Sequence, residues 1–411
     1  MSQSWRNGPR HPLRWTAIAV AGAVGCVWWW SASDRGSPIP PTPTVPDTPT
    51  PGVTVTPPAW GSTADGSTSL DDDRCVTLGL AWLAAHQDPD GRWDGADFAR
   101  HDPPDAPCSG PAQLVGIDPG LTALALTAFA ANGHTHRYGT FKDNVDRGRA
   151  WLVSQLDAGG GLRPPHAPTT FNHATAACAL ADLYGRTKSA RYRAAAEIAV
   201  SRLVATRHPD GAWGRDVRDV GNDLEATGWC VLALWTARSC ELEIGGLDLA
   251  LREALRWIES LVDSETGATL ASTAPAGPAA FAPLTVTTAT VVATLCRQLA
   301  GYRPDDVRLV RGRALLERWP GTVGVGREPL DLRARYFFAQ GMLCGPYLAW
   351  AERRRGVRVA WLTEQRLDAG SERGSWDPGD AWGDAGGRVY STAMNLMALG
   401  CFGYRYPKVF R

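Results

Sequence analysis

The feature that most constrains the fold is an internal repeat of about 50 to 60 residues. Each copy begins with a helical segment that carries an aromatic-Leu pair, continues through a Gly-centred turn and a Trp, and ends in an apolar segment rich in Ala, Leu and Thr. The first copy shows every part of this pattern: Trp82-Leu83, Gln87, the turn 88–91, Trp93 and the apolar segment 121–132. Such a chain is expected to fold as an array of similar units.

Five further copies follow in register. Their apolar segments are 173–184, 224–237, 284–299, 332–351 and 390–402. The third copy is close to ideal, whereas Leu162 replaces the Trp of the second copy and the fifth copy is the most eroded. The Pro-Asp-Gly turns at Gly91 and Gly211 combine a fixed φ, a side chain that bonds the backbone and a residue that tolerates positive φ. Each copy is therefore predicted to be a helical hairpin.

The two helices of a hairpin differ in their apolar surface. Segment 250–258 has one apolar stripe, which is typical of an outer helix, whereas 286–299 is apolar nearly all round and belongs inside. Neither end of the array shows a polar capping repeat, so closure into a ring is favoured. We therefore expect residues 70–411 to form an all-α domain, an (α/α)6 toroid of six helical hairpins.

Three segments precede the repeats. Residues 1–14 contain three Arg, 15–33 are apolar and include three successive Trp, and 34–69 are rich in Pro and Thr. This order predicts a cytoplasmic basic segment, one N-terminal transmembrane helix and a disordered linker. The protein is then expected at the cell membrane as a single-pass protein, with its N-terminus cytoplasmic and its toroid domain extracytoplasmic.

Two other interpretations of the N-terminus stay open. Ser31-Ala32-Ser33 offers a small-residue site at which a signal peptide could be cleaved. A lipoprotein attached through Cys26 is less favoured, because three Trp follow this cysteine almost at once.

Charge and cysteine content exclude some partners. Lys+Arg and Asp+Glu balance at 42 each, so nucleic acid is not expected as a partner. The nine cysteines form no Cys-x-x-Cys pair and no cluster at metal-ligand spacing, so we expect no metal and no cofactor. If the domain is exported, Cys75 and Cys108 are the pair to test for a disulfide.

The pattern of Trp-Leu, then Gln, then Gly-x-Trp resembles the Gln-Trp repeat of squalene-hopene cyclases and protein prenyltransferase β subunits. The resemblance covers about residues 75–405 and is carried best by Trp82 to Trp93. It implies an α/α toroid whose Trp and Gln side chains join neighbouring hairpins, around a cavity lined by inner-helix N-termini.

Candidate catalytic residues are the polar residues that open the apolar segments: Asp118, His173, Asp223, Asp331 and Ser391. N-capping is the simplest role for such residues. The exception is 222–227, which resembles a degraded form of the cyclase motif Asp-x-Asp-Asp-Thr and places Glu225 at the proton-donor position. The resemblance therefore makes Asp223 and Glu225 the catalytic candidates, although Ala226 replaces the last Asp of that motif.

Three functions remain open on this basis, and the oligomeric state is not predicted. The first is a toroid that binds a lipid, an isoprenoid or a peptide in its central cavity without chemistry. The second is a terpenoid cyclase-like isomerase with Glu225 as general acid. The third is a carbohydrate-active α/α barrel that uses two carboxylates.

Overall fold

Helices dominate the part of the chain described by the computed structural model, which is residues 72–110, 114–163, 169–216, 219, 221–270, 284–317, 331–344, 356–380 and 382–402. These residues belong to one unit, Ser67–Arg411. Among them, β-structure is limited to isolated bridges, such as that between Leu156 and Leu162. The prediction of an all-α domain is confirmed.

The predicted segments 1–14, 15–33 and 34–69 lie outside the described residues. None of the described helices has the length and apolar character that a membrane crossing requires. The anchor and the membrane localisation therefore stay predictions.

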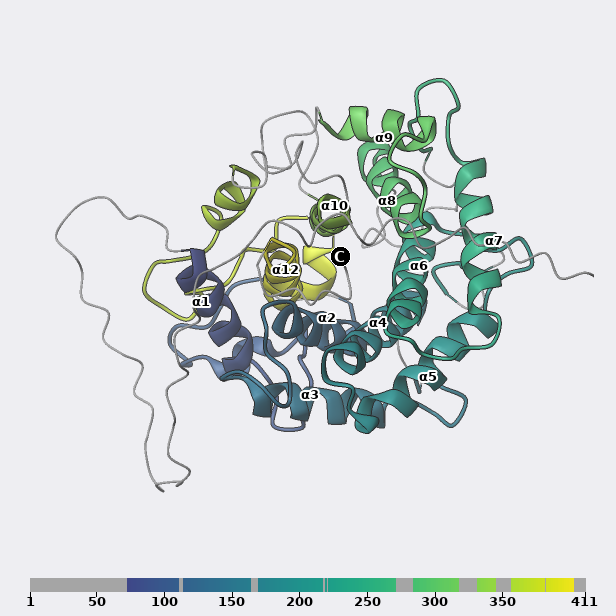
Figure 1. The fold of residues 1–411 in the computed structure, drawn as a ribbon. Coiled ribbons are helices and arrows are strands. Elements are labelled where there is room, and N and C mark those ends of the chain that lie inside the picture. Colours follow the sequence, from purple (N-terminus) through teal and green to yellow (C-terminus); the bar gives the residue numbers. More distant parts are fainter. Residues whose placement is uncertain are drawn as a thin grey trace, which may run out of the picture. The chain divides into compact units, whose positions relative to one another are not determined.

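Six inner helices form a closed ring (Figure 1). Each packs against the next, and α12 packs back against α2. In ring order they are α2 (Asp118–Ala131), α4 (Thr169–Thr187), α6 (Leu224–Ser239), α8 (Val286–Leu299), α10 (Leu332–Cys344) and α12 (Gly383–Gly400). They correspond to the six predicted apolar segments, so the toroid is confirmed rather than an open solenoid.

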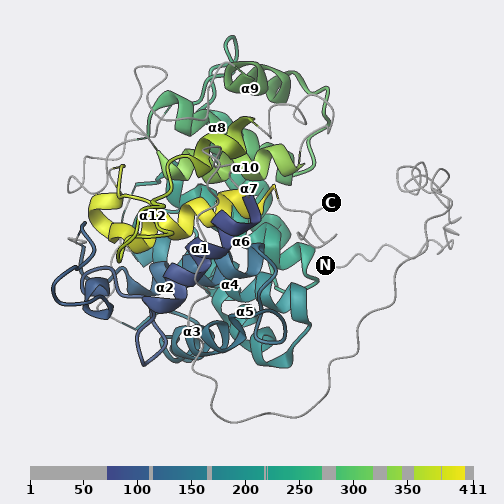
Figure 2. The same cartoon turned by 90° about the vertical axis from the view of Figure 1, so that its left-hand side faces the viewer.

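The outer helices surround this ring. They are α1 (Asp72–Ala85), α3 (Lys142–Ser154), α5 (Ala190–Ala205), α7 (Leu247–Ser260) and α9 (Val307–Glu317), with a further helical segment at 356–362. An outer helix bridges two inner helices: α7 contacts α6 and α8, and α1 contacts α2 and α12. Figure 2 views the ring from the side of α1.

Glycines in the left-handed conformation join each hairpin to the next outer helix. Gly91 has φ 104° and Gly211 has φ 103°, as the turn pattern predicts. A Cβ at Gly211 would lie 2.7 Å from the backbone of Glu253 in α7, and one at Gly91 would lie 2.4 Å from the carbonyl oxygen of Arg147 in α3. Only glycine permits both this conformation and this approach.

The Trp after each turn is held by two hydrogen bonds. The indole of Trp93 donates to the carbonyl of Leu83 at 2.7 Å, and its backbone N–H donates to Thr122 Oγ1 of the inner helix at 3.0 Å. The same two bonds recur in the third and sixth copies, at Trp213 and Trp376. All three rings are buried. The repeated Trp therefore fastens its loop to both helices of its own hairpin.

The repeated Gln joins neighbouring copies. Gln87 Nε2 donates to the carbonyls of Gly91 and of Asn144, which lies on α3. Gln365 Nε2 donates to the carbonyl of Gly374 at 2.7 Å and to that of Cys75 on α1 at 2.8 Å. The structural role predicted for these amides is confirmed, and Gln365 makes one of the contacts between the last copy and the first.

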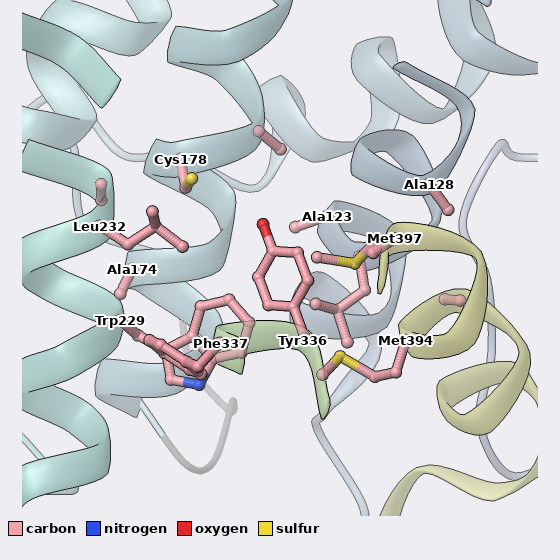
Figure 3. Packing of buried hydrophobic residues seen from close by; sticks show 14 of the residues in the cluster. Ala123, Ala128, Ala174, Cys178, Trp229, Leu232, Tyr336, Phe337, Met394 and Met397 are labelled. Carbon is pink, nitrogen blue, oxygen red and sulfur yellow. The ribbon is translucent and has the colours of Figure 1, made fainter. Parts of the chain in front are cut away.

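Side chains fill the middle of the ring (Figure 3). Tyr336 and Phe337 of α10 point inward and are 2 % and 0 % exposed. Figure 3 shows Tyr336 between Leu232 of α6 and the methionines Met394 and Met397 of α12. The centre of the ring is thus a packed core among the described residues.

Two inner helices begin earlier than the sequence indicates. Helix α4 begins at Thr169, so His173 lies in its second turn, and α12 begins at Gly383, so Ser391 lies in its interior. Gly387 interrupts α12 with φ 65°. The prediction that His173 and Ser391 open their helices was wrong, because the residues before them join the helix despite their polar or Gly-rich character.

Cys75 and Cys108 are buried and do not form the disulfide considered for them. Cys75 lies in α1, whereas the Cys108 sulfur lies 3.9 Å from His86 Nε2.

Replacing Gly211 with Ala should destabilise the domain by about 2 kcal/mol, because the left-handed conformation costs about 1 to 2 kcal/mol and the Cβ meets the backbone of α7. Gly245 is exposed and has open space around its Cα, so Gly245→Ala is the control and should change stability by less than about 0.5 kcal/mol. Urea unfolding measures both. Equal stability of the two variants would contradict the proposed role of the turn.

Replacing Gln365 with Ala should cost about 2 kcal/mol, because the buried carbonyls of Cys75 and Gly374 lose their donor. Gln155 is the control, since its amide donates only to the exposed Ser154 hydroxyl. Hydrogen exchange of α1 amides should become faster in Gln365→Ala and stay unchanged in Gln155→Ala. Unchanged exchange in both would show that closure does not depend on this amide.

Candidate functional site

A pocket lies at the N-terminal ends of the inner helices, where the family resemblance implies a cavity. Its volume is about 260 Å³ including its open mouth. Three aromatic rings form much of its wall: Phe171 from the first turn of α4, Trp229 from α6 and Trp382, which precedes α12. The remaining lining residues are Arg215, Asp223, Glu225 and Ala226.

Asp223 caps helix α6 as the sequence predicts. Its backbone is extended, and its Oδ1 accepts the N–H of Ala226 at 2.9 Å. Its other oxygen accepts from Arg215 Nε at 2.7 Å. Both carboxylate oxygens of Asp223 therefore have donors, which suits a charged residue that positions the helix end.

Glu225 lies two residues further along α6 and is only 7 % exposed. Its Oε2 accepts from Arg333 Nη1 at 2.6 Å, whereas its Oε1 is buried and has no hydrogen-bond partner among the described residues. A buried polar atom without a partner costs about 1 to 3 kcal/mol. The burial of Glu225 Oε1 thus destabilises the folded state, and neither packing nor helix capping accounts for it.

Arg333 of α10 connects Glu225 to a second carboxylate. Its Nε and Nη2 donate to the two oxygens of Asp331, each at 2.9 Å. Asp331 also accepts the backbone N–H of Ala334 at 3.2 Å and the Thr288 hydroxyl at 3.0 Å. Asp331 is a cap, as predicted, and is the better satisfied of the two carboxylates that share Arg333.

This unequal sharing separates the pKa values of the two carboxyl groups. Burial raises the pKa of Glu225 to about 7, against the lowering effect of Arg333, and Asp223 and Asp331 raise it further. Burial also raises the pKa of Asp331, but the charge and hydrogen bonds of Arg333 outweigh it and hold that pKa below its ordinary value. One guanidinium cannot fully compensate two anions, so the proton resides on Glu225.

The aromatic rings continue from the pocket into the core. The centroid of Phe171 lies 5.0 Å from that of Trp382 and 5.8 Å from that of Trp229. Trp229 stacks on Tyr336 at 5.6 Å. The Arg333 guanidinium lies 5.9 Å from the Trp382 ring. Glu225 therefore shares the pocket wall with aromatic rings, whose π faces attract positive charge.

The other sequence candidates lie apart from this pocket. Asp118 is the first residue of α2, next to Arg92, and burial raises its pKa to about 6. His173 is buried, with its Nε2 2.9 Å from the carbonyl oxygen of Ala199, and burial lowers its pKa to about 4. Ser391 is buried inside α12. Of the five candidates, the structure places Asp223 in the pocket and Asp331 beside it, behind Arg333.

Sequence analysis missed Arg333, Phe171 and Trp382. An Arg inside an apolar inner-helix segment was an available signal, because a buried guanidinium requires an anionic partner. Its partner could not be identified, since Glu225 lies 108 residues earlier in the chain. The aromatic residues carry no local signal that separates a pocket wall from a core.

Comparison with known proteins supports the fold alone. No known family matches the sequence, and no curated protein does. Similar solved structures include an α-1,6-mannanase from Salegentibacter sp., with a TM-score of 0.56 and 10% identity over 80% of this chain and 98% of that chain. The type II terpene cyclase MstE from Scytonema has a TM-score of 0.52 and 14% identity over 80% and 97%. A protein from Actinoplanes has a TM-score of 0.50 and 18% identity over 81% and 100%. The chain is thus an α/α toroid, a fold that these structures share.

The raised pKa of Glu225 predicts a pH dependence of stability. The carboxyl group holds its proton more tightly in the folded state, with a pKa of about 7, than in the unfolded state, with a pKa of about 4.5. The stability that this provides is complete below about pH 4.5 and is lost as pH rises through about 7. Between about pH 5 and pH 8, the wild-type free energy of unfolding should therefore fall relative to that of Glu225→Gln, by about 1 to 3 kcal/mol. Parallel pH profiles of the two proteins would show that Glu225 is already ionised.

Proposed function

We propose that the toroid binds an apolar, alkene-containing ligand of the isoprenoid class in the aromatic pocket, and that Glu225 protonates it as a general acid. The observation that carries this proposal is a carboxyl group with a pKa of about 7, buried in the wall of a pocket that three aromatic rings also line. Groups with such perturbed pKa values cluster at functional sites. The function is that of a cyclase-like isomerase.

The site residues suit each part of this reaction. Arg333 holds Oε2 of Glu225, so the proton belongs on Oε1, for which the described part of the chain offers no partner. Its transfer to one alkene carbon forms a C–H bond from the π electrons and leaves a carbocation at the other carbon. Arg333 stabilises the glutamate that remains, and the faces of Phe171, Trp229 and Trp382 stabilise the cation. Loss of a proton from the cation to a carboxylate restores an alkene, so the reaction is a redox-neutral isomerisation.

Pocket size limits the ligand. The empty volume of about 260 Å³ includes solvent outside the open mouth, so it is larger than the enclosed space. The enclosed space holds about one water molecule and is far below the range of about 300 to 1,000 Å³ that is typical of small-molecule pockets. The core formed by Tyr336 and Phe337 blocks extension through the ring. An isoprenoid would therefore enter only by its end, with movement of side chains in the pocket wall.

One observation favours a second candidate, a glycoside hydrolase. Glu225 and Asp331 share Arg333, and their pKa values are displaced in opposite directions. An acid and an ionised carboxylate side by side form the pair that glycosidases use. The mannanase among the similar structures makes α-1,6-mannan the substrate to test. Against this candidate, Asp331 is fully engaged by Arg333, Thr288 and backbone N–H groups, and the pocket wall is aromatic.

Isotope incorporation tests the proposal without knowledge of the product. The full-length protein is incubated with geranylgeraniol and shorter prenyl alcohols in D2O, and the recovered lipid is analysed by mass spectrometry. Alkene protonation by Glu225 should add solvent-derived deuterium to carbon. Glu225→Gln should lower incorporation at least about a hundredfold, because the amide cannot supply the proton.

Glu243→Gln is the matched control, since Glu243 is exposed on the surface and should keep full activity. Prenyl alcohol that binds without incorporating deuterium would reduce the function to ligand binding. Release of reducing ends from α-1,6-mannan, lost in Glu225→Gln, would favour the glycosidase instead. Neither binding nor turnover with either substrate class would refute both proposals.

A further inference from the structure

A second cluster of chemically active side chains lies away from the pocket. His86 Nε2, an oxygen of Asp102 and the Cys108 sulfur lie within 4.8 Å of one another, and their side chains are almost completely buried. They come from the end of an outer helix and the loop that follows it, whereas the pocket is built at inner-helix starts. We propose that His86, Asp102 and Cys108 form a metal site for a borderline divalent cation, Zn²⁺ foremost.

The hydrogen bonds around the cluster orient its acceptor atoms inward. His86 Nδ1 lies 2.7 Å from the Trp82 carbonyl oxygen, which can only accept, so Nδ1 carries the hydrogen and donates. In the neutral ring this leaves the lone pair on Nε2, which faces Asp102 Oδ1 at 3.0 Å. The other Asp102 oxygen accepts the backbone N–H of Cys108 at 2.8 Å. A histidine that donates one N–H to a backbone carbonyl and presents its other nitrogen is the usual arrangement in metal sites.

The distances from His86 Nε2 to the other two ligand atoms are close to those around a small tetrahedral ion, and all three atoms lie within 4.8 Å of one another. Metal–ligand distances of about 2.0 to 2.3 Å place neighbouring ligand atoms about 3.3 to 3.8 Å apart. The cluster has 3.0 Å between His86 Nε2 and Asp102 Oδ1, and 3.9 Å between His86 Nε2 and Cys108 Sγ. Adjustments of a few tenths of an ångström bring both separations into range. One nitrogen, one oxygen and one sulfur donor suit Zn²⁺ rather than Mg²⁺ or Ca²⁺, which prefer oxygen.

Contacts with neighbouring residues hold the three ligand residues in place without a bound metal. The Trp82 ring stacks on His86, with centroids 3.9 Å apart and an interplanar angle of 23°. Ser109, next to Cys108, donates through its backbone N–H to Glu372, and its carbonyl accepts from Arg388 of α12. The site thus lies where the first copy meets the last. Three protein ligands leave a fourth position for water or for an exogenous donor.

Metal analysis of the full-length protein tests this site. After dialysis against Zn²⁺ and then against metal-free buffer, the wild type should retain about one equivalent per chain. The Co²⁺-substituted protein should show the near-ultraviolet band of a thiolate ligand. Cys108→Ser should lose that band and bind Zn²⁺ at least about tenfold more weakly. Chelation should lower the melting temperature of the wild type but not that of Cys108→Ser.

Cys296→Ser is the matched control, because Cys296 is a buried free thiol of α8 outside the cluster. It should keep both the metal and the Co²⁺ band. If Cys108→Ser fails to fold, Asp102→Asn supplies the same affinity comparison. A wild type without retained metal, or a Co²⁺ thiolate band that persists in Cys108→Ser, would overturn the proposal and leave a buried His–Asp ion pair.

Discussion

Closure of the ring depends on a backbone contact that only glycine permits. In the described turns, a glycine with positive φ sits against the backbone of the next outer helix, and a Cβ there would meet that backbone at 2.2 to 3.1 Å. At the junction of the ends, Gly374 lies against Leu78 of α1 in the same way. Because the same contact recurs between neighbouring hairpins wherever the turn is described, it helps to set the angle at which each hairpin follows the last.

Electrostatics at the pocket follow from a shortage of positive charge. Arg215 pairs with Asp223, whereas Arg333 must serve both Glu225 and Asp331. Asp380 lies near the same group; burial raises its pKa to about 6, and the charge of Asp331 raises it further. In a low-dielectric site the extra anions are neutralised by protons instead of by cations. One of these carboxyl groups lacks a full counter-charge. It therefore keeps its proton up to about neutral pH and can act as an acid there.

The sequence predicted the fold well because its signals are local. The Trp93 and Trp213 turns fix a hairpin within about fifteen residues, and the apolar segments fix the inner layer. Capping by Asp223 and Asp331 was predictable for the same reason. The pairing of Glu225 with Arg333 and the approach of Cys108 to His86 were not, because both arise only when separate segments fold together. Helix starts at Thr169 and Gly383 were missed, since tertiary packing overrides weak propensity there.

Positions within the repeat pattern make structural contacts, whereas positions outside the pattern supply residues near Glu225. The same two structural hydrogen bonds, one donated by the indole N–H and one by the backbone N–H, recur at Trp93, Trp213 and Trp376. Three residues around Glu225 come from positions outside the pattern: Phe171 in the copy that lacks the Trp, Arg333 in the most eroded copy, and Trp382 beyond the last Gly-x-Trp. A repeat contact fixes both its donor and its acceptor, so it leaves no group for a ligand. The site therefore combines Glu225, which lies on the inner helix of the near-ideal third copy, with residues from positions where the equivalence of the hairpins fails.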